Sequence, residues 1–133
     1  MSVKARIASI QNLQPGDHVG YGMRYTAQEN RRIAVLPLGY GDGFPRVRNL
    51  GCALIHGKRA PIVGGVSMDA LTVDIADIPE AKLWDVATLM GRDGEDEISV
   101  HEIAKIKNSA SYDVLCSGRG RLPRLYVNDE PVQ

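Results

Sequence analysis

The sequence predicts a mainly β domain: an antiparallel, Greek-key β-barrel that is closed or nearly closed and carries one short helix. About seven short apolar or alternating segments follow one another at roughly even spacing, separated by turn residues. Only one segment combines a helix start signal with a helical apolar face. Because a chain of 133 residues is the size of one domain, we treat residues 1–133 as a single unit.

The first half of the chain contains three expected strands. Val3 to Ile10 alternates between two faces, which is the pattern of a half-buried strand. Turn residues at 13–17 separate it from a second extended stretch at His18 and Val19. After a polar turn, Arg32 to Leu38 is strongly apolar. Pro37 cannot donate a backbone hydrogen bond, so we expect the end of this strand at a sheet edge or a bulge.

The second half supplies the remaining strands. We expect them at residues 52–56, 59–64, 71–75, 85–90 and 122–127. Gly57 and Lys58 would join the first two in a type II′ turn, because glycine stands at the first turn position. Arg92 to Gly94 is expected to turn the chain after the strand at 85–90.

The helix is expected to begin at Ser99. Ser99 and Glu102 form a capping box, in which each side chain satisfies the free backbone donor of the other residue. Ile103, Ala104 and Ile106 then supply a short apolar face. A second, shorter helical turn is expected from Tyr112 to Cys116.

Composition excludes several classes of function. The formal net charge is zero, from 16 basic and 16 acidic residues, so electrostatics gives no reason to expect nucleic acid or a membrane surface as partner. No apolar run is long enough to span a bilayer, and no basic and apolar leader opens the chain. We therefore expect a cytoplasmic protein, and its first strand already resembles a segment from within a longer chain.

The cysteines and histidines give no metal site. Cys52 and Cys116 are two isolated residues, which form neither a disulfide framework nor a zinc pattern. His18, His56 and His101 are scattered without metal-ligand spacing. We therefore predict structural or surface roles for all five residues and no bound metal.

Two tyrosines stand in glycine-rich surroundings. Tyr21 lies between Gly20 and Gly22, and Tyr40 lies in the run from Gly39 to Gly43. Flanking glycines weaken a strand but allow the backbone to approach a ligand and the phenol to be exposed. The alternative, a pair of turn tyrosines with buried rings, stays open at this point. A nucleotide loop is excluded, because the glycine spacing is wrong and no helical pattern follows.

Two other glycine-rich segments are ambiguous. Val63 to Asp69 could be a simple hairpin bend, or it could present a backbone N–H to an anion, and the residues do not separate these alternatives. Arg119, Arg121 and Arg124 are interleaved with Gly118 and Gly120, a basic and glycine-rich pattern that an oligonucleotide-binding barrel could also show. Stacking aromatic residues are missing there apart from Tyr126, which disfavours that interpretation.

Five blocks, taken in order, resemble motifs of the alanine racemase family and together cover most of the chain. They are GYGMRYTA at 20–27, LPLGYGDG at 36–43, KRAPIVGGVSMD at 58–69, SYDVLC at 111–116 and LPRLY at 122–126. The corresponding family patterns are S-Y-G-x-x-Y-T-A, I-P-[IL]-G-Y-[AG]-D-G, [KR]-x-[AC]-P-I-[VL]-G-[RN]-[IV]-[CS]-M-D, N-Y-E-[VL]-x-C and V-P-R-x-Y. One block alone would be a weak signal, whereas five in family order are specific.

The resemblance implies a racemase that depends on pyridoxal 5′-phosphate (PLP) and interconverts L- and D-alanine. In this family the C-terminal β-barrel packs head-to-tail against the N-terminal (β/α)8 barrel of the partner subunit in a homodimer. That barrel carries the lysine to which PLP is bound, and it is absent from this chain. The resemblance therefore implies half of an active site, inactive by itself.

The resemblance also implies roles for individual residues. Tyr21 matches the base that removes the α-hydrogen of the L-amino acid, and Tyr40 matches a tyrosine at the inner mouth of the site. The backbone N–H of Met68 matches a group that holds the substrate carboxylate. Arg46 matches a basic residue of the substrate corridor, and Tyr112 matches a tyrosine that reaches the cofactor phosphate.

Two departures from the family patterns bear on specificity. Gly65 stands where many members carry arginine or asparagine, and residues 118–120 also differ. A serine or broad-specificity racemase domain is therefore the alternative to an alanine racemase domain. A free-standing oligonucleotide-binding module is a third, less favoured alternative.

Overall fold

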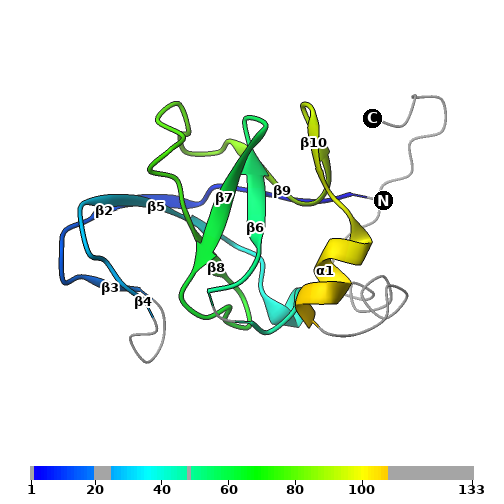
Figure 1. Cartoon of the computed structure of the whole chain (residues 1–133), viewed down its shortest axis with the longest axis horizontal. Helices are drawn as coiled ribbons and strands as arrows, with labels where there is room; N and C mark the ends of the chain where they lie inside the picture. The colour runs from blue at the N-terminus through cyan, green and yellow to red at the C-terminus, as the bar shows by residue number, and fades with distance from the viewer. Residues whose placement is uncertain (1, 20–24, 48, 108–133) are drawn as a thin grey trace.

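The computed structural model describes residues 2–19, 25–47 and 49–107, and these residues form a mainly β structure (Figure 1). The strands are β1 (Val3–Arg6), β2 (Ser9–Leu13), β3 (His18–Val19), β4 (Tyr25–Thr26), β5 (Arg31–Leu36), β6 (Cys52–Ile55), β7 (Lys58–Val63), β8 (Leu71–Asp74), β9 (Val86–Asp93) and β10 (Asp96–Ile98). The helical elements are the 3-10 helix η1 (Tyr40–Asp42) and the α-helix α1 (Val100–Lys107). The predicted elements at 112–116 and 122–127 lie outside the described residues.

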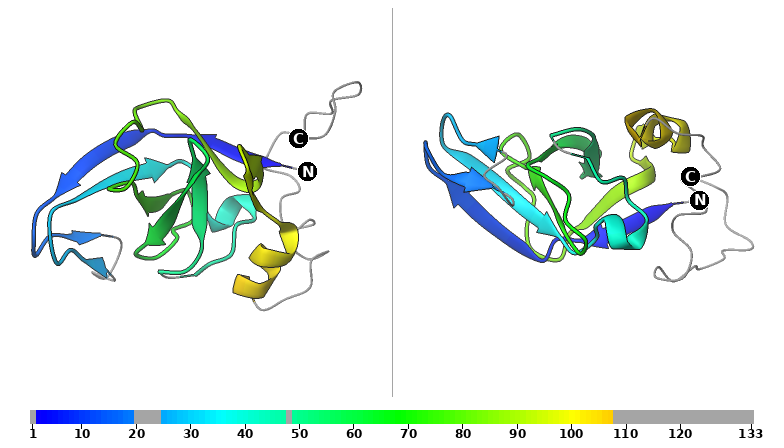
Figure 2. Two further views of the ribbon diagram at one scale, coloured as in Figure 1. Left: turned by 45° about the horizontal axis from the view of Figure 1, so that its top comes forward. Right: turned by 90° about the horizontal axis from the view of Figure 1, so that it is seen from below.

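Eight strands form one antiparallel sheet. Their order is β1-β9-β6-β7-β8-β5-β2, β10 pairs with β9, and β3 and β4 form a separate pair. Figure 2 shows the large sheet curled into a half-barrel. The predicted class, mainly β and antiparallel with one short helix, is confirmed. The prediction also called for a closed or nearly closed barrel. Among the described residues, the strand pairs form an open half-barrel, because no pair joins the two ends of the strand order.

The strand expected from Val3 to Ile10 is divided in two. Its first part, β1, pairs with β9, and its second part, β2, pairs with β5 at the other end of the strand order. The change of partner falls at Ile7 and Ala8, whose N–H groups donate to Asp85 O and to Val35 O, each at 2.9 Å. The chain thus bends from one edge of the sheet to the other.

One predicted turn was wrong by one register position, and another was expected too early in the chain. Ile55 pairs with Lys58, so His56 and Gly57 form the turn between β6 and β7. Both have positive φ, 53° and 74°, which is the geometry of a type I′ turn and not of the predicted II′. The strand expected at 85–90 continues as β9 to Asp93 and returns as β10, which was not predicted.

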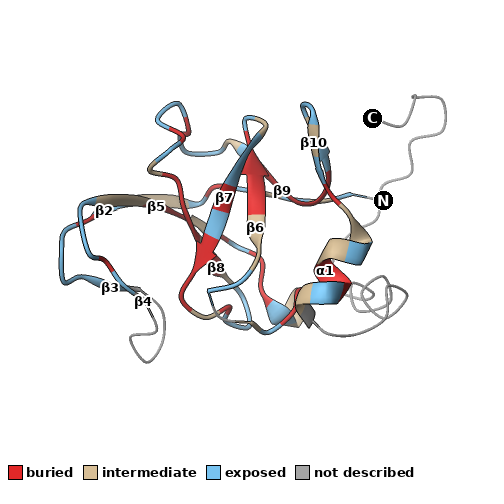
Figure 3. Ribbon diagram, in the orientation of Figure 1, coloured by how far each residue is buried: buried red, intermediate tan, exposed pale blue. Residues whose placement is uncertain are grey.

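The core lies against the middle strands of the sheet (Figure 3). Its largest fully buried side chains come from several strands and from the segments that follow β1 and β8, and they include Ile7, Leu36, Ile55, Leu71, Ile75, Ile78 and Leu89. This continuous packing fixes where each strand ends. The loops at those ends therefore have defined positions.

Helix α1 begins as predicted, but its capping box is only half formed. The Ser99 hydroxyl accepts the backbone N–H of Glu102 at 3.1 Å. The Glu102 carboxylate binds Arg59 instead of returning to Ser99. Ile103 and Ala104 pack with buried residues of β6, β9 and β10, which attaches the helix to the sheet. In the described ranges, no helix has the length and apolar character that a bilayer crossing requires.

Candidate functional site

Sheet topology brings two glycine-rich loops together. Strands β5 and β7 both run antiparallel to β8, so their C-terminal ends lie at the same edge of the sheet, beside the start of β8. The loop at 39–43 follows β5, and the loop at 64–70 follows β7. Residues that are far apart in the sequence therefore meet at one edge.

The loop at 39–43 is a tight turn around η1. The Asp42 carboxylate accepts the N–H of Gly39 at 3.1 Å, and the N–H of Asp42 donates to Gly39 O at 3.0 Å. The turn ends at Gly43, whose φ of 103° favours glycine, and whose N–H donates to Tyr40 O at 3.1 Å. Tyr40 is left 38% exposed, so the alternative of a buried turn tyrosine is excluded for this residue.

The loop at 64–70 ends in a turn closed by Ser67. Both the N–H and the hydroxyl of Ser67 donate to Ala70 O at 2.9 Å, and the hydroxyl also accepts the N–H of Ala70 at 3.1 Å. Met68 and Asp69 stand at the tip of this turn. The Met68 side chain is 52% exposed.

The two loops touch through their backbones. The N–H of Tyr40 donates to Ser67 O at 3.0 Å, and the N–H of Gly41 donates to Met68 O at 2.9 Å. A Cβ atom at Gly39 would lie 2.1 Å from Ser67 O and 2.7 Å from the carbonyl of Met68. The φ of Gly39, −144°, suits any residue, so backbone conformation does not require glycine at this position. The close approach of the two backbones does.

Arg46 completes this part of the site. Its guanidinium carbon lies 5.1 Å from the centroid of the Tyr40 ring, within the range of a cation–π contact. Its segment is tied to the other loop, because the N–H of Val66 donates to Val47 O at 2.9 Å. The structure thus brings together three of the five predicted site residues: Tyr40, Arg46 and Met68.

The other two predicted site residues cannot be placed. Tyr21 belongs to the segment 20–24, between β3 and β4, and Tyr112 follows α1; both lie outside the described residues. Among the residues that are described, no three side chains of His, Cys, Asp or Glu gather as a metal site would need.

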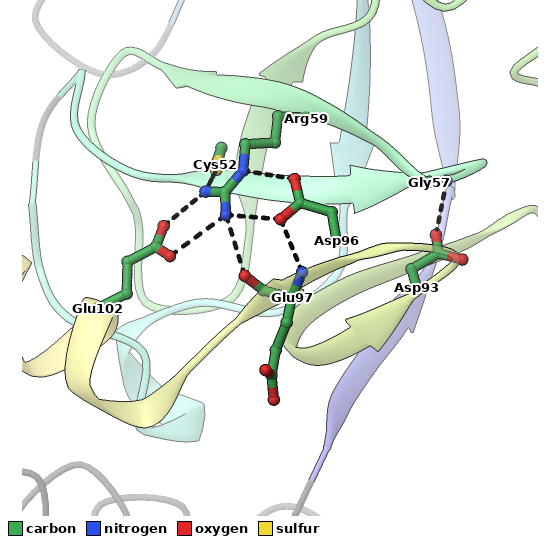
Figure 4. Close-up of polar contacts among 7 residues, drawn as sticks. All are labelled: Cys52, Gly57, Arg59, Asp93, Asp96, Glu97 and Glu102. Atoms are coloured by element: carbon green, nitrogen blue, oxygen red, sulfur yellow. Dashed lines mark hydrogen bonds and ion pairs between the residues drawn. The ribbon is translucent and has the colours of Figure 1, made fainter. Parts of the chain in front are cut away.

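A polar cluster centred on Arg59 was not predicted (Figure 4). Its guanidinium donates to Asp96 at 2.8 Å, to Glu102 at 2.7 Å, to Glu97 O at 3.0 Å and to Cys52 Sγ at 3.2 Å. The cluster connects β7 to β10 and α1. Arg59 holds the pKa of the Asp96 carboxyl below its usual range, and burial raises the pKa of the Cys52 thiol. A thiol with a raised pKa is a poor nucleophile, so we assign the cluster a structural role.

Comparison with known proteins gives one family. A family model described as the C-terminal domain of alanine racemase matches residues 1–126. An alanine racemase of Halothermothrix orenii is 37% identical over 94% of this chain, which corresponds to 33% of that protein. An amino-acid racemase of Enterococcus faecalis is 43% identical over 90% of this chain and 17% of that protein. The chain thus spans about a third, or less, of these two relatives.

Solved structures agree with the sequence relatives. An alanine racemase of Bacillus anthracis with bound L-Ala-P superposes with a TM-score of 0.90 at 32% identity, over 98% of this chain and 33% of that one. An alanine racemase of Bartonella henselae with covalently bound pyridoxal phosphate gives a TM-score of 0.87 at 27% identity, over 95% and 34% of the two chains.

Proposed function

The chain belongs to the family of alanine racemase C-terminal domains, and from that premise we propose that it supplies one side of the active site of a PLP-dependent racemase that interconverts L- and D-alanine. The observation that carries the proposal is the meeting of Tyr40, Arg46 and Met68 at one sheet edge, in a chain whose family match covers residues 1–126. The remaining part of the site would come from the N-terminal (β/α)8 barrel of the partner subunit in a head-to-tail homodimer.

The reaction sets clear demands on the protein. PLP, when bound, delocalises the electron pair that remains after the α-hydrogen is removed. Racemisation then requires a base on each face of the substrate, so that a proton leaves on one side and returns on the other. We propose the phenol of Tyr21 for the L face. A free phenol has a pKa of about 10, so this role needs a stabilising group from the partner subunit's barrel.

The Met68 peptide group fits the substrate carboxylate. The Met68 side chain is exposed, and within the described ranges its backbone N–H donates no hydrogen bond. Such an N–H can donate a hydrogen bond to an anion without losing an internal bond. Arg46, 5.1 Å from the Tyr40 ring, adds positive charge on the same side of the site. Together they favour a substrate that bears a carboxylate.

The described residues fit a cofactor that is held by another domain. Lys58, at the start of β7, pairs with Glu80 at 3.0 Å at the sheet edge opposite to Met68. This position lies at the other end of β7 from the Tyr40 and Met68 loops, so Lys58 does not line the candidate site. We propose that Tyr112 contacts the cofactor phosphate and that the lysine belongs to the partner barrel, so the isolated chain would not racemise alanine.

One observation favours a different substrate. The Enterococcus faecalis relative is described as an amino-acid racemase, without reference to alanine. A serine or broad-specificity racemase domain is therefore the second candidate. The ratio of kcat/KM for L-alanine to that for L-serine in the full-length enzyme separates the two functions.

Two finer expectations from the sequence also belong to this proposal. We propose that the curled sheet closes into a barrel in the full-length enzyme, since the bent strand formed by β1 and β2 already reaches both ends of the strand order. The cytoplasmic location expected from composition is proposed for the same enzyme, and cell fractionation tests it.

The decisive test is Tyr21→Phe in the full-length enzyme. The substitution keeps the ring and removes the phenol oxygen, so racemisation should fall by about 10²–10⁴-fold, the usual contribution of a positioned acid–base group. Exchange of the α-hydrogen of D-alanine with heavy water should be affected less than that of L-alanine. Tyr25→Phe, four residues further on, is the matched control. Equal slowing of both enantiomers would show that Tyr21 is not the L-face base.

A further inference from the structure

The peptide group between Ser67 and Met68 is engaged on one side only. Its C=O accepts the N–H of Tyr40 at 3.0 Å. Because a trans peptide is planar, its N–H points in the opposite direction to its C=O. The N–H of Met68 therefore points away from the Tyr40 backbone, and it makes no hydrogen bond to the part of the chain that the structure describes.

Two polar side chains fix the orientation of this peptide group. On one side, the Ser67 hydroxyl holds both backbone groups of Ala70 and closes the turn at 67–70. On the other side, the Asp42 carboxylate holds the N–H of Gly39 at 3.1 Å and closes the loop from which Tyr40 donates. The lack of a Cβ at Gly39 allows the two backbones to make contact.

The hydrogen bond from Tyr40 also has an electronic effect. Hydrogen bonds that share a peptide group polarise one another, so a donor on the C=O makes the N–H of the same group a stronger donor. The Tyr40 N–H, the Ser67 C=O and the Met68 N–H form such a chain. The Met68 N–H is thus both oriented and strengthened as a donor to an anion.

We propose that Asp42 and Ser67 are positioning residues, which hold the Ser67–Met68 peptide group so that its N–H is directed at the carboxylate of the amino-acid substrate. Neither side chain needs to touch the substrate. This inference rests on the proposed function. Ser67 is exposed and outside the core, so removal of its hydroxyl should leave the fold intact.

The test measures separately how well the enzyme binds the carboxylate of the substrate and how well it binds the amino group. In the full-length enzyme, propionate is alanine without the amino group, and ethylamine is alanine without the carboxylate. We expect Ser67→Ala and Asp42→Ala to raise the inhibition constant of propionate about tenfold and to leave that of ethylamine unchanged. The KM for alanine should rise by the same factor while kcat changes little, because the contact is made in both the ground state and the transition state.

Three variants serve as controls. Ser67→Thr and Asp42→Asn keep a hydroxyl and an acceptor oxygen respectively, and both should restore the inhibition constant of propionate. Ser99→Ala removes a hydroxyl that also accepts one backbone N–H, at the start of α1. It should lower the unfolding temperature and leave both inhibition constants unchanged.

The outcomes are distinct. If Ser67→Ala leaves propionate binding unchanged, or weakens propionate and ethylamine equally, the hydroxyl does not position a carboxylate donor and the inference is overturned. Failure of both conservative variants to restore propionate binding overturns it as well. If the wild-type enzyme racemises no amino acid, the proposed function is overturned and this inference with it. If the wild-type enzyme racemises alanine and the variants give the results above, only this inference fails.

Discussion

Gly39→Ala tests the backbone contact on which the site depends. The new Cβ would lie 2.1 Å from Ser67 O, whereas ordinary contacts begin beyond 3 Å. The two loops would have to move apart by about 1 Å, since the atoms in conflict belong to the backbone and not to a flexible side chain. The N–H of Tyr40 and the N–H of Gly41, now 3.0 and 2.9 Å from their acceptors, would then leave hydrogen-bond range.

The expected cost of this substitution follows from these losses. Two backbone hydrogen bonds contribute about 1 kcal/mol each, and overpacking adds about 1–3 kcal/mol. The sum is roughly 3–5 kcal/mol of unfolding free energy. For a chain of this size we take about 3–5 °C per kcal/mol, which gives a decrease of about 10 °C or more in the unfolding temperature.

The measurement is thermal unfolding followed by circular dichroism, with Gly16→Ala as the matched control. Gly16 has a φ of 94° and no atom within 4 Å of a built Cβ, so alanine there meets backbone strain but no clash. That strain costs about 1–2 kcal/mol, less than the change at Gly39. If Gly39→Ala unfolds at or above the temperature of Gly16→Ala, the two loops do not touch as described.

Three further predictions concern features outside this contact. Arg59→Lys keeps the charge but loses the planar fork that reaches two carboxylates, so we expect a lower unfolding temperature, and an unchanged value would refute the structural role of the cluster. His56 and Arg59 hold the pKa values of Asp85 and Asp96 below the ordinary range, so the stability that these two carboxylates contribute should be complete above about pH 5 and should be lost as the pH drops below about 4, measured as the urea midpoint. Trp84 is 64% exposed at a φ of 73°, so Trp84→Gly should unfold at a higher temperature than Trp84→Ala.

Local pattern located most of the long strands but not their registers or the short strand β10. Alternation located β1 and β8, and apolar runs located β5 and most of β9, where several consecutive residues are buried. The turn at His56 and Gly57 depends on which residues pair across it, and glycine can occupy either turn position. Strand β10 was missed because Asp96 and Glu97 are charged, and the strand forms by pairing with β9.

The site shows the same division between local and tertiary information. Flanking glycines left open whether the Tyr40 ring is exposed or buried, and its 38% exposure decides between the two alternatives. The reason for glycine at position 39 could not be read from the sequence, because the atoms in conflict belong to Ser67 and Met68 in another loop. Likewise, nothing beside Arg59 in the sequence indicates that Asp96 and Glu102 are its partners.

The donor offered at position 68 is a main-chain atom, and this affects how variation at that position should be understood. Nineteen of the twenty amino acids carry the same N–H, and proline alone lacks it. An alanine scan of this loop would therefore leave the donor in place and would classify Met68 as dispensable. The phenotype would instead appear at Gly39, Asp42 and Ser67, whose atoms hold that peptide group in place. Tolerance of substitution at position 68 would thus be compatible with a central role for its backbone.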